Sequence, residues 1–232
     1  MRLRVGTSGY NFPEWKGSFY PPKLPAAKWL EYYASQLGAV EINYTFYRMP
    51  SAKTVAGWDA ATPAGFTFIL KAPQRITHIG RLKNVDEALR YFLETARLLG
   101  PKLGPILFQL PPNFKQDLER LGDVLTLFPA ELRCAWEFRH ASWFADDTYD
   151  ALRTANAALC VADTDAGTTP LEATADFGYA RLRDEGYSAE ALRDWVGKLR
   201  TLGAKWTDAY VFFKHEGEGE GPKLAAQLAA LF

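Results

Sequence analysis

Residues 133–143 read Arg-Cys-Ala-Trp-Glu-Phe-Arg-His-Ala-Ser-Trp, an apolar run that ends in a charged cluster. Side chains alternate between the two faces of a β-strand, so Ala135, Glu137 and Arg139 would share one face. The bulky apolar residues between them would share the other face. A strand that packs its apolar face under helices needs an enclosed, polar-lined space for the charges opposite. The mouth of a barrel would supply that space.

Outward from this stretch, runs rich in branched and aromatic residues alternate with longer segments whose apolar residues recur at helical spacing. Further strands are predicted over 4–8, 39–43, 66–71, 105–110, 158–163, 177–182 and 209–214. Helices are predicted over 26–37, 51–61, 85–99, 118–127, 147–157, 189–202 and 224–231. Ser51 is expected to cap the second of these helices.

Eight strands joined by such segments favour one fold. Consecutive strands with crossover helices must be parallel, and eight of them in about 230 residues suit a closed barrel better than an open, doubly wound sheet. We therefore predict an α/β fold, a single (β/α)8 TIM-barrel domain over residues 1–232. Residues 164–175 are too short and threonine-rich for a full helix. The crossover between strands six and seven is expected to be degenerate.

Composition narrows the class of protein. The 232 residues are 48% apolar and 14% aromatic, enough to bury a large core. Lys plus Arg equals Asp plus Glu at 27 each, so no global attraction to nucleic acid or an anionic membrane is expected. No apolar stretch approaches the ~18 to 20 residues of a membrane-spanning helix. The N-terminus lacks a signal-peptide core, and Cys134 and Cys160 lie in apolar runs. We expect a soluble, reduced, cytoplasmic protein of open oligomeric state, with no membrane partner.

Polar residues finish most of the predicted strands. In a TIM barrel the active site lies at the carboxyl ends of the strands, so these residues would meet at one mouth. The candidates at strand ends are Ser8, Glu41, Asn43, Lys71, Gln109, Glu137, Arg139, Asp163 and Arg181. The candidates in the adjoining loops are Tyr10, Trp15, Tyr47 and His140. This collection at one end predicts a functional site there.

Several of these residues have a plainer interpretation. Glu137 and Arg139 lie two residues apart on one face, and they could form a structural ion pair. Asp163 could cap the turn that follows its strand. Tyr10, Tyr47 and the other aromatic loop residues could simply cover the barrel, although aromatic loops around a polar mouth also suit stacking on a sugar or a base. Both interpretations stay open.

The charges at the mouth bear on the kind of ligand. Glu41, Glu137, Asp163 and His140 are ligands that a divalent cation accepts. The lysine and arginines expected at the same mouth disfavour a resident cation and favour an anionic ligand. The sequence has no GxGxxG after a strand, no P-loop, no CxxC, no HExxH and no serine elbow. We expect no cofactor and no resident metal.

Several separate motifs, in order, cover most of the chain. They are Val-Gly-Thr-Ser-Gly over 5–9, Val-Glu-Ile-Asn-Tyr-Thr-Phe-Tyr-Arg-Met-Pro over 40–50, Leu-Lys over 70–71 with Ile-Thr-His over 76–78, Leu-Gly-Pro-Ile-Leu-Phe-Gln-Leu-Pro-Pro over 103–112, and Glu-Phe-Arg-His-Ala-Ser-Trp over 137–143. This set resembles the YecE-like family, domain of unknown function seventy-two. The resemblance implies a barrel loosely grouped with sugar isomerase-like barrels, and it supplies no reaction.

The chain departs from the family pattern in a few loops. Tyr10 stands where the family usually has Trp, and Ala141 where it usually has Pro. Residues 181–184 read Arg-Leu-Arg-Asp in place of Arg-Leu-His-Gly. Lys214-His215 and a Glu-Gly stretch follow the last strand, where the family tends to carry asparagines. The first two changes leave the charged set at the mouth intact.

The leading hypothesis is an enzyme that acts on a small anionic, polyhydroxylated ligand such as a sugar phosphate or sugar acid. Arg139 and Arg181 would hold the anion, because arginine offers a fixed fork of donors. Glu41 or Glu137 would act as general base. Lys71, or alternatively His140, would act as the acid or stabilise a developing enolate, in chemistry of isomerase or lyase type.

The alternative is a non-catalytic module that binds a metabolite, a nucleotide or nucleic acid at the same mouth. Arg48, Arg75 and Arg81 lie near aromatic loops, so nucleic acid remains a candidate ligand. The zero net charge of the chain counts against nucleic-acid binding.

Overall fold

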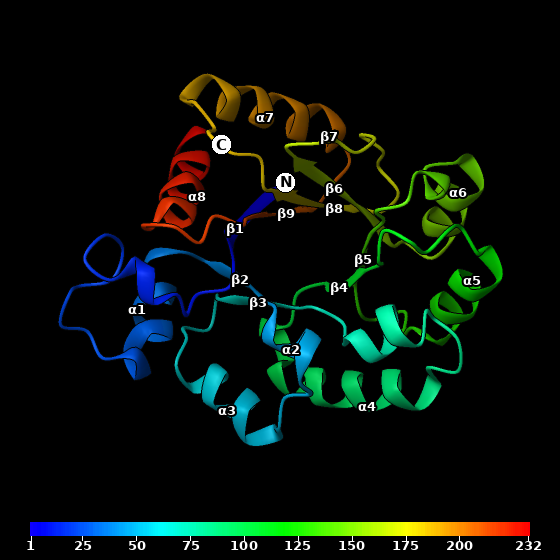
Figure 1. Ribbon diagram of the computed structural model, residues 1–232, viewed down its shortest axis with the longest axis horizontal. Helices are drawn as coiled ribbons and strands as arrows, with labels where there is room; N and C mark the ends of the chain where they lie inside the picture. Colours follow the sequence, from blue (N-terminus) through cyan, green and yellow to red (C-terminus); the bar gives the residue numbers. More distant parts are fainter.

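A computed structural model describes residues 1–232 and shows an α/β barrel of eight parallel strands (Figure 1). The parallel strands are β1 (Arg2–Ser8), β2 (Ala39–Ile42), β3 (Thr67–Leu70), β4 (Ile106–Gln109), β5 (Cys134–Glu137), β6 (Ala158–Thr164), β8 (Phe177–Leu182) and β9 (Asp208–Phe213). A two-residue strand, β7 (Gly167–Thr168), pairs antiparallel with the end of β6. The TIM-barrel prediction is confirmed.

The barrel is nearly closed. Its strands follow the order β3-β2-β1-β9-β8-β6-β5-β4, and β3 and β4 complete the ring through short bridges. Phe68 bridges to Leu103 and Lys71 to Leu107. The amide of Gly104 donates to the Phe68 carbonyl at 2.8 Å. These contacts bring the ends of β3 and β4, and with them Lys71, to the same mouth.

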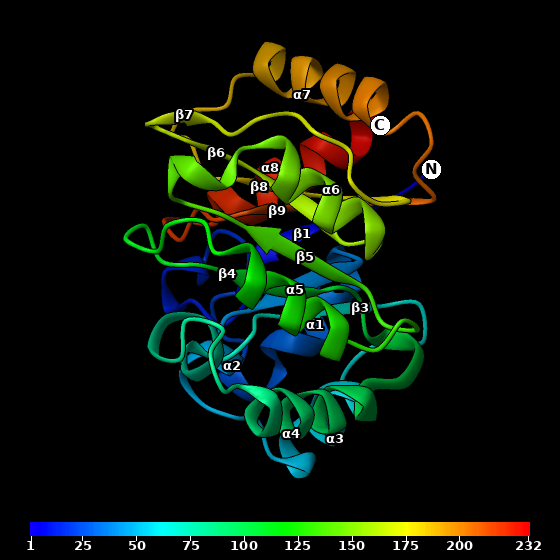
Figure 2. The ribbon, with the colours of Figure 1, turned by 90° about the vertical axis from the view of Figure 1, so that its right-hand side faces the viewer.

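Helices surround the strands (Figures 1 and 2). The longer ones are α1 (Trp29–Gln36), α3 (Ala52–Ala60), α4 (Asp86–Ala96), α5 (Leu118–Leu127), α6 (Asp146–Thr154), α7 (Ala189–Leu202) and α8 (Glu220–Leu231). Short helical turns fill several loops: α2 (Tyr44–Tyr47), η1 (Pro13–Trp15), η2 (Ala26–Lys28), η3 (Arg75–Ile79), η4 (Arg97–Lys102) and η5 (Ala141–Trp143). Of these helices, none has the length and apolar character needed to cross a bilayer.

The predicted elements match the structure closely. The bounds of α5, β8 and α7 agree to the residue. The Ser51 hydroxyl caps α3 by accepting a hydrogen bond from the Thr54 amide at 3.1 Å. The last helix begins at Glu220, four residues before its predicted start at 224.

The crossover between β6 and β8 contains no helix, as its composition suggested. The chain instead turns back on β6, where the Thr169 amide donates to the Ala162 carbonyl at 2.9 Å. The Thr169 hydroxyl also accepts a hydrogen bond from the Ala162 amide at 2.9 Å. The Thr169 hydroxyl thus satisfies a backbone amide near the end of β6.

The alternation predicted for β5 is observed. Trp136 and Phe138 belong to the apolar layer between strands and helices, whereas Ala135 belongs to the separate layer inside the barrel. Trp136 stacks on Phe108 with ring centroids 4.6 Å apart, and Phe138 stacks on Trp143 at the same separation. These buried rings hold the segment after β5 against the barrel wall.

Both cysteines, Cys134 and Cys160, are buried free thiols. Burial raises the pKa of the Cys134 thiol to about 12 and that of Cys160 well above its usual value. Thiolates are therefore disfavoured at both positions.

We expect Gly6→Ala to destabilise the barrel, because a Cβ at this position would lie 1.9 Å from the Ala39 carbonyl oxygen on β2. Overpacking of this kind costs about 1–3 kcal/mol or more. Gly122→Ala is the matched control, because a Cβ there meets nothing within 4 Å and a helical alanine is favoured by up to ~1 kcal/mol. Guanidinium chloride unfolding measures both variants. Equal unfolding free energies for the two would contradict the close β1–β2 approach.

Candidate functional site

A buried guanidinium occupies the upper barrel interior. Arg181, at the end of β8, is 1% exposed. Its Nη2 lies 2.8 Å from Glu41 Oε1, and its Nη1 lies 2.5 Å from Glu137 Oε2. The same Nη1 donates to Gln109 Oε1 at 3.3 Å. Arg181 thereby links side chains from β2, β4 and β5 across the barrel.

Strand register places these partners. Gln109 on β4 is the direct neighbour of Glu137 on β5, so both side chains point into the barrel at the same level. Glu41 is held by a second donor, the Tyr179 hydroxyl, at 2.7 Å. Burial and the neighbouring Glu41 charge raise the pKa of Tyr179 well above its usual value, so this hydroxyl keeps its proton.

Glu137 is completely buried and contacts three arginines. Its Oε1 lies 3.0 Å from Arg139 Nε and 3.1 Å from Arg183 Nη2. Burial opposes ionisation, but the positive charges of these two and of Arg181 outweigh it and hold the pKa of Glu137 well below its usual range. Glu137 is therefore a carboxylate at neutral pH.

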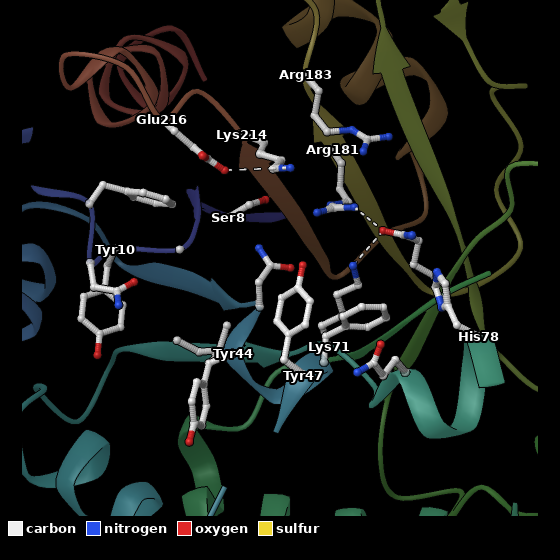
Figure 3. Close-up of a pocket in the computed structure, with 18 of the residues that line it drawn as sticks. Ser8, Tyr10, Tyr44, Tyr47, Lys71, His78, Arg181, Arg183, Lys214 and Glu216 are labelled. Carbon is white, nitrogen blue, oxygen red and sulfur yellow. Dashed lines mark hydrogen bonds and ion pairs between the residues drawn. The ribbon is translucent and has the colours of Figure 1, made fainter. Parts of the chain in front are cut away.

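A cavity of about 770 Å³ opens above this network, at the carboxyl ends of the strands (Figure 3). Its polar lining includes Ser8, Asn43, Lys71, Gln74, His78, Gln109, Arg139, Arg181, Arg183, Lys214 and Glu216. Its aromatic lining comprises Tyr10, Phe12, Tyr44, Phe46, Tyr47 and Trp58. Cations outnumber carboxylates along this surface, although the chain as a whole is neutral.

Lys71 supplies the amine at the cavity floor. Its Nζ donates to Gln109 Oε1 at 2.9 Å and lies 4.1 Å from the centroid of the Phe46 ring. Figure 3 shows this amine and the Arg181 guanidinium converging on the same amide oxygen. Burial, reinforced by the Arg181 charge, lowers the pKa of Lys71 to about 8. Burial and the nearby Lys71 charge lower the pKa of His78 to about 4, so its imidazole is neutral at physiological pH.

Most of the predicted site residues lie at this mouth. The cavity is lined by Ser8, Tyr10, Asn43, Tyr47, Lys71, Gln109, Arg139 and Arg181. Glu41 and Glu137 lie directly beneath it and bind its guanidinium groups. The pair of Glu137 and Arg139 exists, as the plainer interpretation held, but within a larger network that includes Arg181 and Arg183.

Besides Glu41 and Glu137, three predicted residues do not line the cavity. Trp15 is fully buried and donates through Nε1 to the Glu216 carbonyl at 2.9 Å, so it supports the loop after β9. The Nδ1 of His140 caps the turn η5 by accepting from the Ser142 amide at 3.2 Å. The Asp163 carboxylate is absent from the lining and is bonded to two hydroxyl groups.

Asp163 anchors the β6–β7 turn. Its Oδ1 accepts from the Thr168 hydroxyl at 2.5 Å, and its Oδ2 accepts from the Tyr187 hydroxyl at 2.6 Å. The carboxylate therefore organises local structure, in line with the turn-related role considered from the sequence. Burial and the Asp163 carboxylate raise the pKa of Tyr187 well above its usual value.

Other lining residues were not among the candidates. Lys214 ends the last predicted strand, over 209–214, and Arg183 lies just beyond the strand over 177–182; both line the cavity. His78 and Gln74 come from the loop after β3 and its turn η3, where no strand-end signal exists. Within the structure, no group of three or more His, Cys, Asp or Glu side chains is arranged to hold a metal ion.

Comparison with known proteins places this chain in a family. The family model described as "Protein of unknown function DUF72" matches residues 4–232. The chain belongs to the DUF72 family. This membership confirms the resemblance to YecE-like proteins that the motifs indicated.

Curated DUF72 relatives share part of this chain. The UPF0759 protein YecE of Escherichia coli K12 is 34% identical over 117 residues, which are 50% of this chain and 43% of YecE. The UPF0759 protein YunF of Bacillus subtilis is 31% identical over 157 residues, 64% of this chain and 54% of YunF. The chain spans about half the length of these relatives.

Solved DUF72 structures share the fold over the whole chain. A crystal structure of a DUF72 family protein from Thermotoga maritima superposes with a TM-score of 0.82 at 27% identity, covering 100% of this chain and 99% of that one. A DUF72 protein from Enterococcus faecalis gives a TM-score of 0.81 at 20% identity, with 99% and 94% covered. Neither description names a ligand or a reaction.

We expect Glu137→Gln to flatten the acid side of the stability profile. Because the pKa of Glu137 in the folded state is lower than its unfolded value of ~4.3, the unfolded state binds more protons in acid. The stabilisation is therefore full above about pH 5 and lost as the pH falls toward the folded pKa. Between about pH 5 and 3 the wild-type unfolding free energy should fall more steeply than that of the variant, by up to ~1.4 kcal/mol per pH unit.

Urea denaturation at a series of pH values measures this slope. Glu94→Gln, on the exposed surface of α4, is the matched charge change outside any ion pair. Parallel profiles for wild type and Glu137→Gln would show that Glu137 does not carry a depressed pKa.

Proposed function

We propose that this protein is an enzyme that binds a small anionic, polyhydroxylated molecule, a sugar phosphate or sugar acid, and moves a proton on it in chemistry of isomerase or lyase type. The observation that carries this proposal is Lys71, an 8%-exposed amine with a pKa of about 8 at the floor of a polar cavity. Its only polar side-chain partner is an uncharged amide, that of Gln109. Perturbed amines of this kind gather at functional sites.

The charges around Lys71 favour an anion. Glu41 and Glu137 lie beneath the cavity and are already engaged by Arg181. Arg139 remains one-third exposed at the cavity wall and contacts one carboxylate oxygen only. Its planar donors suit a phosphate or carboxylate bound side-on.

Two polar atoms suit the hydroxyl groups of such a ligand. Ser8 Oγ and Asn43 Oδ1 are buried at the cavity wall and have no hydrogen-bond partner in the protein. Buried polar atoms are normally paired, so a ligand that offers hydroxyl groups would satisfy both. Tyr10 and Tyr47 add aromatic surface of the kind that packs on sugar rings.

Lys71 is the group best suited to move the proton. A general acid or base works best when its pKa lies near the working pH, and about 8 meets this condition. Glu137 meets it poorly, because its arginine partners hold its pKa far below neutrality. In the proposal Glu41 and Glu137 balance the charge of Arg181 and hold its guanidinium in place. Arg139 and Arg181 stabilise negative charge that develops on the ligand.

A binding module is the alternative that one observation favours. Tyr47 is 73% exposed and Tyr44 45% exposed at the cavity rim. Exposed rings beside cations can stack on a nucleotide base without any chemistry. Ligand binding in the absence of proton exchange would support this alternative.

We expect Lys71→Met to weaken binding of ribose 5-phosphate and 6-phosphogluconate by roughly 10- to 100-fold, the loss of one charge-assisted hydrogen bond. Wild-type affinity should fall as the pH rises from 7 to 9, because Lys71 loses its charge with a pKa of about 8. The variant should lose this pH dependence. Isothermal titration calorimetry measures both, with exposed Lys53→Met on α3 as control. Binding that is equal in wild type and Lys71→Met would refute an anion site at Lys71.

Turnover is tested by proton exchange. We expect wild-type protein in D₂O to incorporate deuterium next to the carbonyl of one or more aldose or ketose phosphates, followed by loss of the NMR signal of that proton. Lys71→Met should abolish the incorporation, whereas Lys53→Met should retain it. If sugar phosphates bind and no exchange occurs across the series, the proton-transfer part of the proposal is wrong.

A further inference from the structure

A second hollow of about 550 Å³ adjoins the cavity. It is formed by the β6–β7 turn and the residues that follow it, 164–170, together with Pro112 and Phe144. Arg139 and Arg183 line both hollows. These two guanidinium groups therefore stand at the boundary between two spaces that each fall within the 300–1,000 Å³ range of small-molecule sites.

The boundary arginines keep free donors. Each contacts Glu137 Oε1 through one nitrogen, Arg139 through Nε and Arg183 through Nη2. Neither side chain makes another hydrogen bond within the protein, and the Nε of Arg183 is buried without a partner. Arg183 is 15% exposed and Arg139 34%. Both guanidinium groups are thus fixed by one carboxylate oxygen and can still donate to an anion.

The second hollow differs in character from the cavity. Its wall includes the exposed carboxylate of Asp165 and the apolar side chains of Phe144 and Pro112. The Thr169 hydroxyl accepts from the Ala162 amide, which leaves its own proton free to donate. A carboxylate repels a second phosphate and accepts hydrogen bonds from hydroxyl groups. The hollow suits an uncharged, hydroxylated or ring-bearing group.

We infer that the ligand carries an organic group on each side of a phosphate or diphosphate. The anion lies against Arg139 and Arg183. One organic group occupies the cavity beside Ser8 and Asn43, and the other occupies the hollow beside Asp165. The ligand class is therefore a phosphodiester or a diphosphate-bridged compound instead of a simple phosphate monoester. The inference rests on the proposed function, because it requires an anion at the mouth.

The test compares two-sided probes with their halves. Dissociation constants are measured for ADP-ribose against AMP and ribose 5-phosphate, and for thymidylyl-thymidine against thymidine monophosphate. At least one two-sided probe should bind about tenfold or more tightly than either of its halves, because the second group adds contact without a second loss of translational freedom.

Ala166→Trp tests the hollow itself. Ala166 lies on its wall with an exposed side chain, so an indole there fills the space. The variant should remove the advantage of the two-sided probe and leave ribose 5-phosphate binding within about twofold of wild type. Ala204→Trp is the matched control, since Ala204 is exposed just before β9, at the opposite end of the barrel.

The outcomes separate this inference from the proposed function. Monoesters that bind as tightly as the two-sided probes, with binding that depends on Lys71, would overturn the inference and leave the proposed function standing. A two-sided advantage that survives Ala166→Trp would also overturn it. If no phosphate compound binds, the inference fails, and the proposed function fails with it when no sugar acid binds either.

Discussion

The Arg181 guanidinium is the charge on which the upper barrel depends. Burying such a cation costs several kcal/mol even after relaxation, so it needs close partners in the same interior. Glu41 and Glu137 supply them at 2.8 and 2.5 Å. The three side chains come from β8, β2 and β5, which are not neighbours of one another in the barrel. The ion pairs therefore tie three non-adjacent strands together across the ring.

This constraint also decides which groups are available for chemistry. Glu137 is held in the charged state beneath the cavity by its arginine partners, so its depressed pKa makes it a poor proton acceptor at neutral pH. The same positive charge that stabilises Glu137 contributes to the lowered pKa of Lys71. The buried Arg181 guanidinium thus lowers the pKa of the Glu137 carboxyl and also the pKa of the Lys71 amine. The mouth gains an amine that titrates near pH 8, while Glu137 beneath it remains ionised.

The fold was predictable because strand-like and helix-like segments alternate regularly along the chain. Residues 133–143 show one apolar and one charged face, and eight strands joined by crossover segments in about 230 residues leave few arrangements other than a barrel. The site was predictable where a side chain finishes a strand, as with Lys71 and Arg181. It was not predictable where a loop decides the direction of the side chain. His140 bonds to the backbone of its own turn, and Asp163, near the end of β6, bonds to the hydroxyls of Thr168 and Tyr187, which lie in segments without a periodic pattern.

Arg139 lies between the two cases, the side chains directed by a strand and those directed by a loop. It lies two residues beyond the end of β5, where strand geometry no longer dictates its direction. The alternation nevertheless continues, because Phe138 stacks on Trp143 at 4.6 Å in the outer layer and so forces the next side chain toward the barrel. Apolar packing on one face, and not backbone pairing, therefore brings this guanidinium to the boundary of the two hollows. A residue beyond the end of a strand can be predicted to face the mouth only where apolar packing on the outer face, such as that of Phe138 on Trp143, continues the alternation.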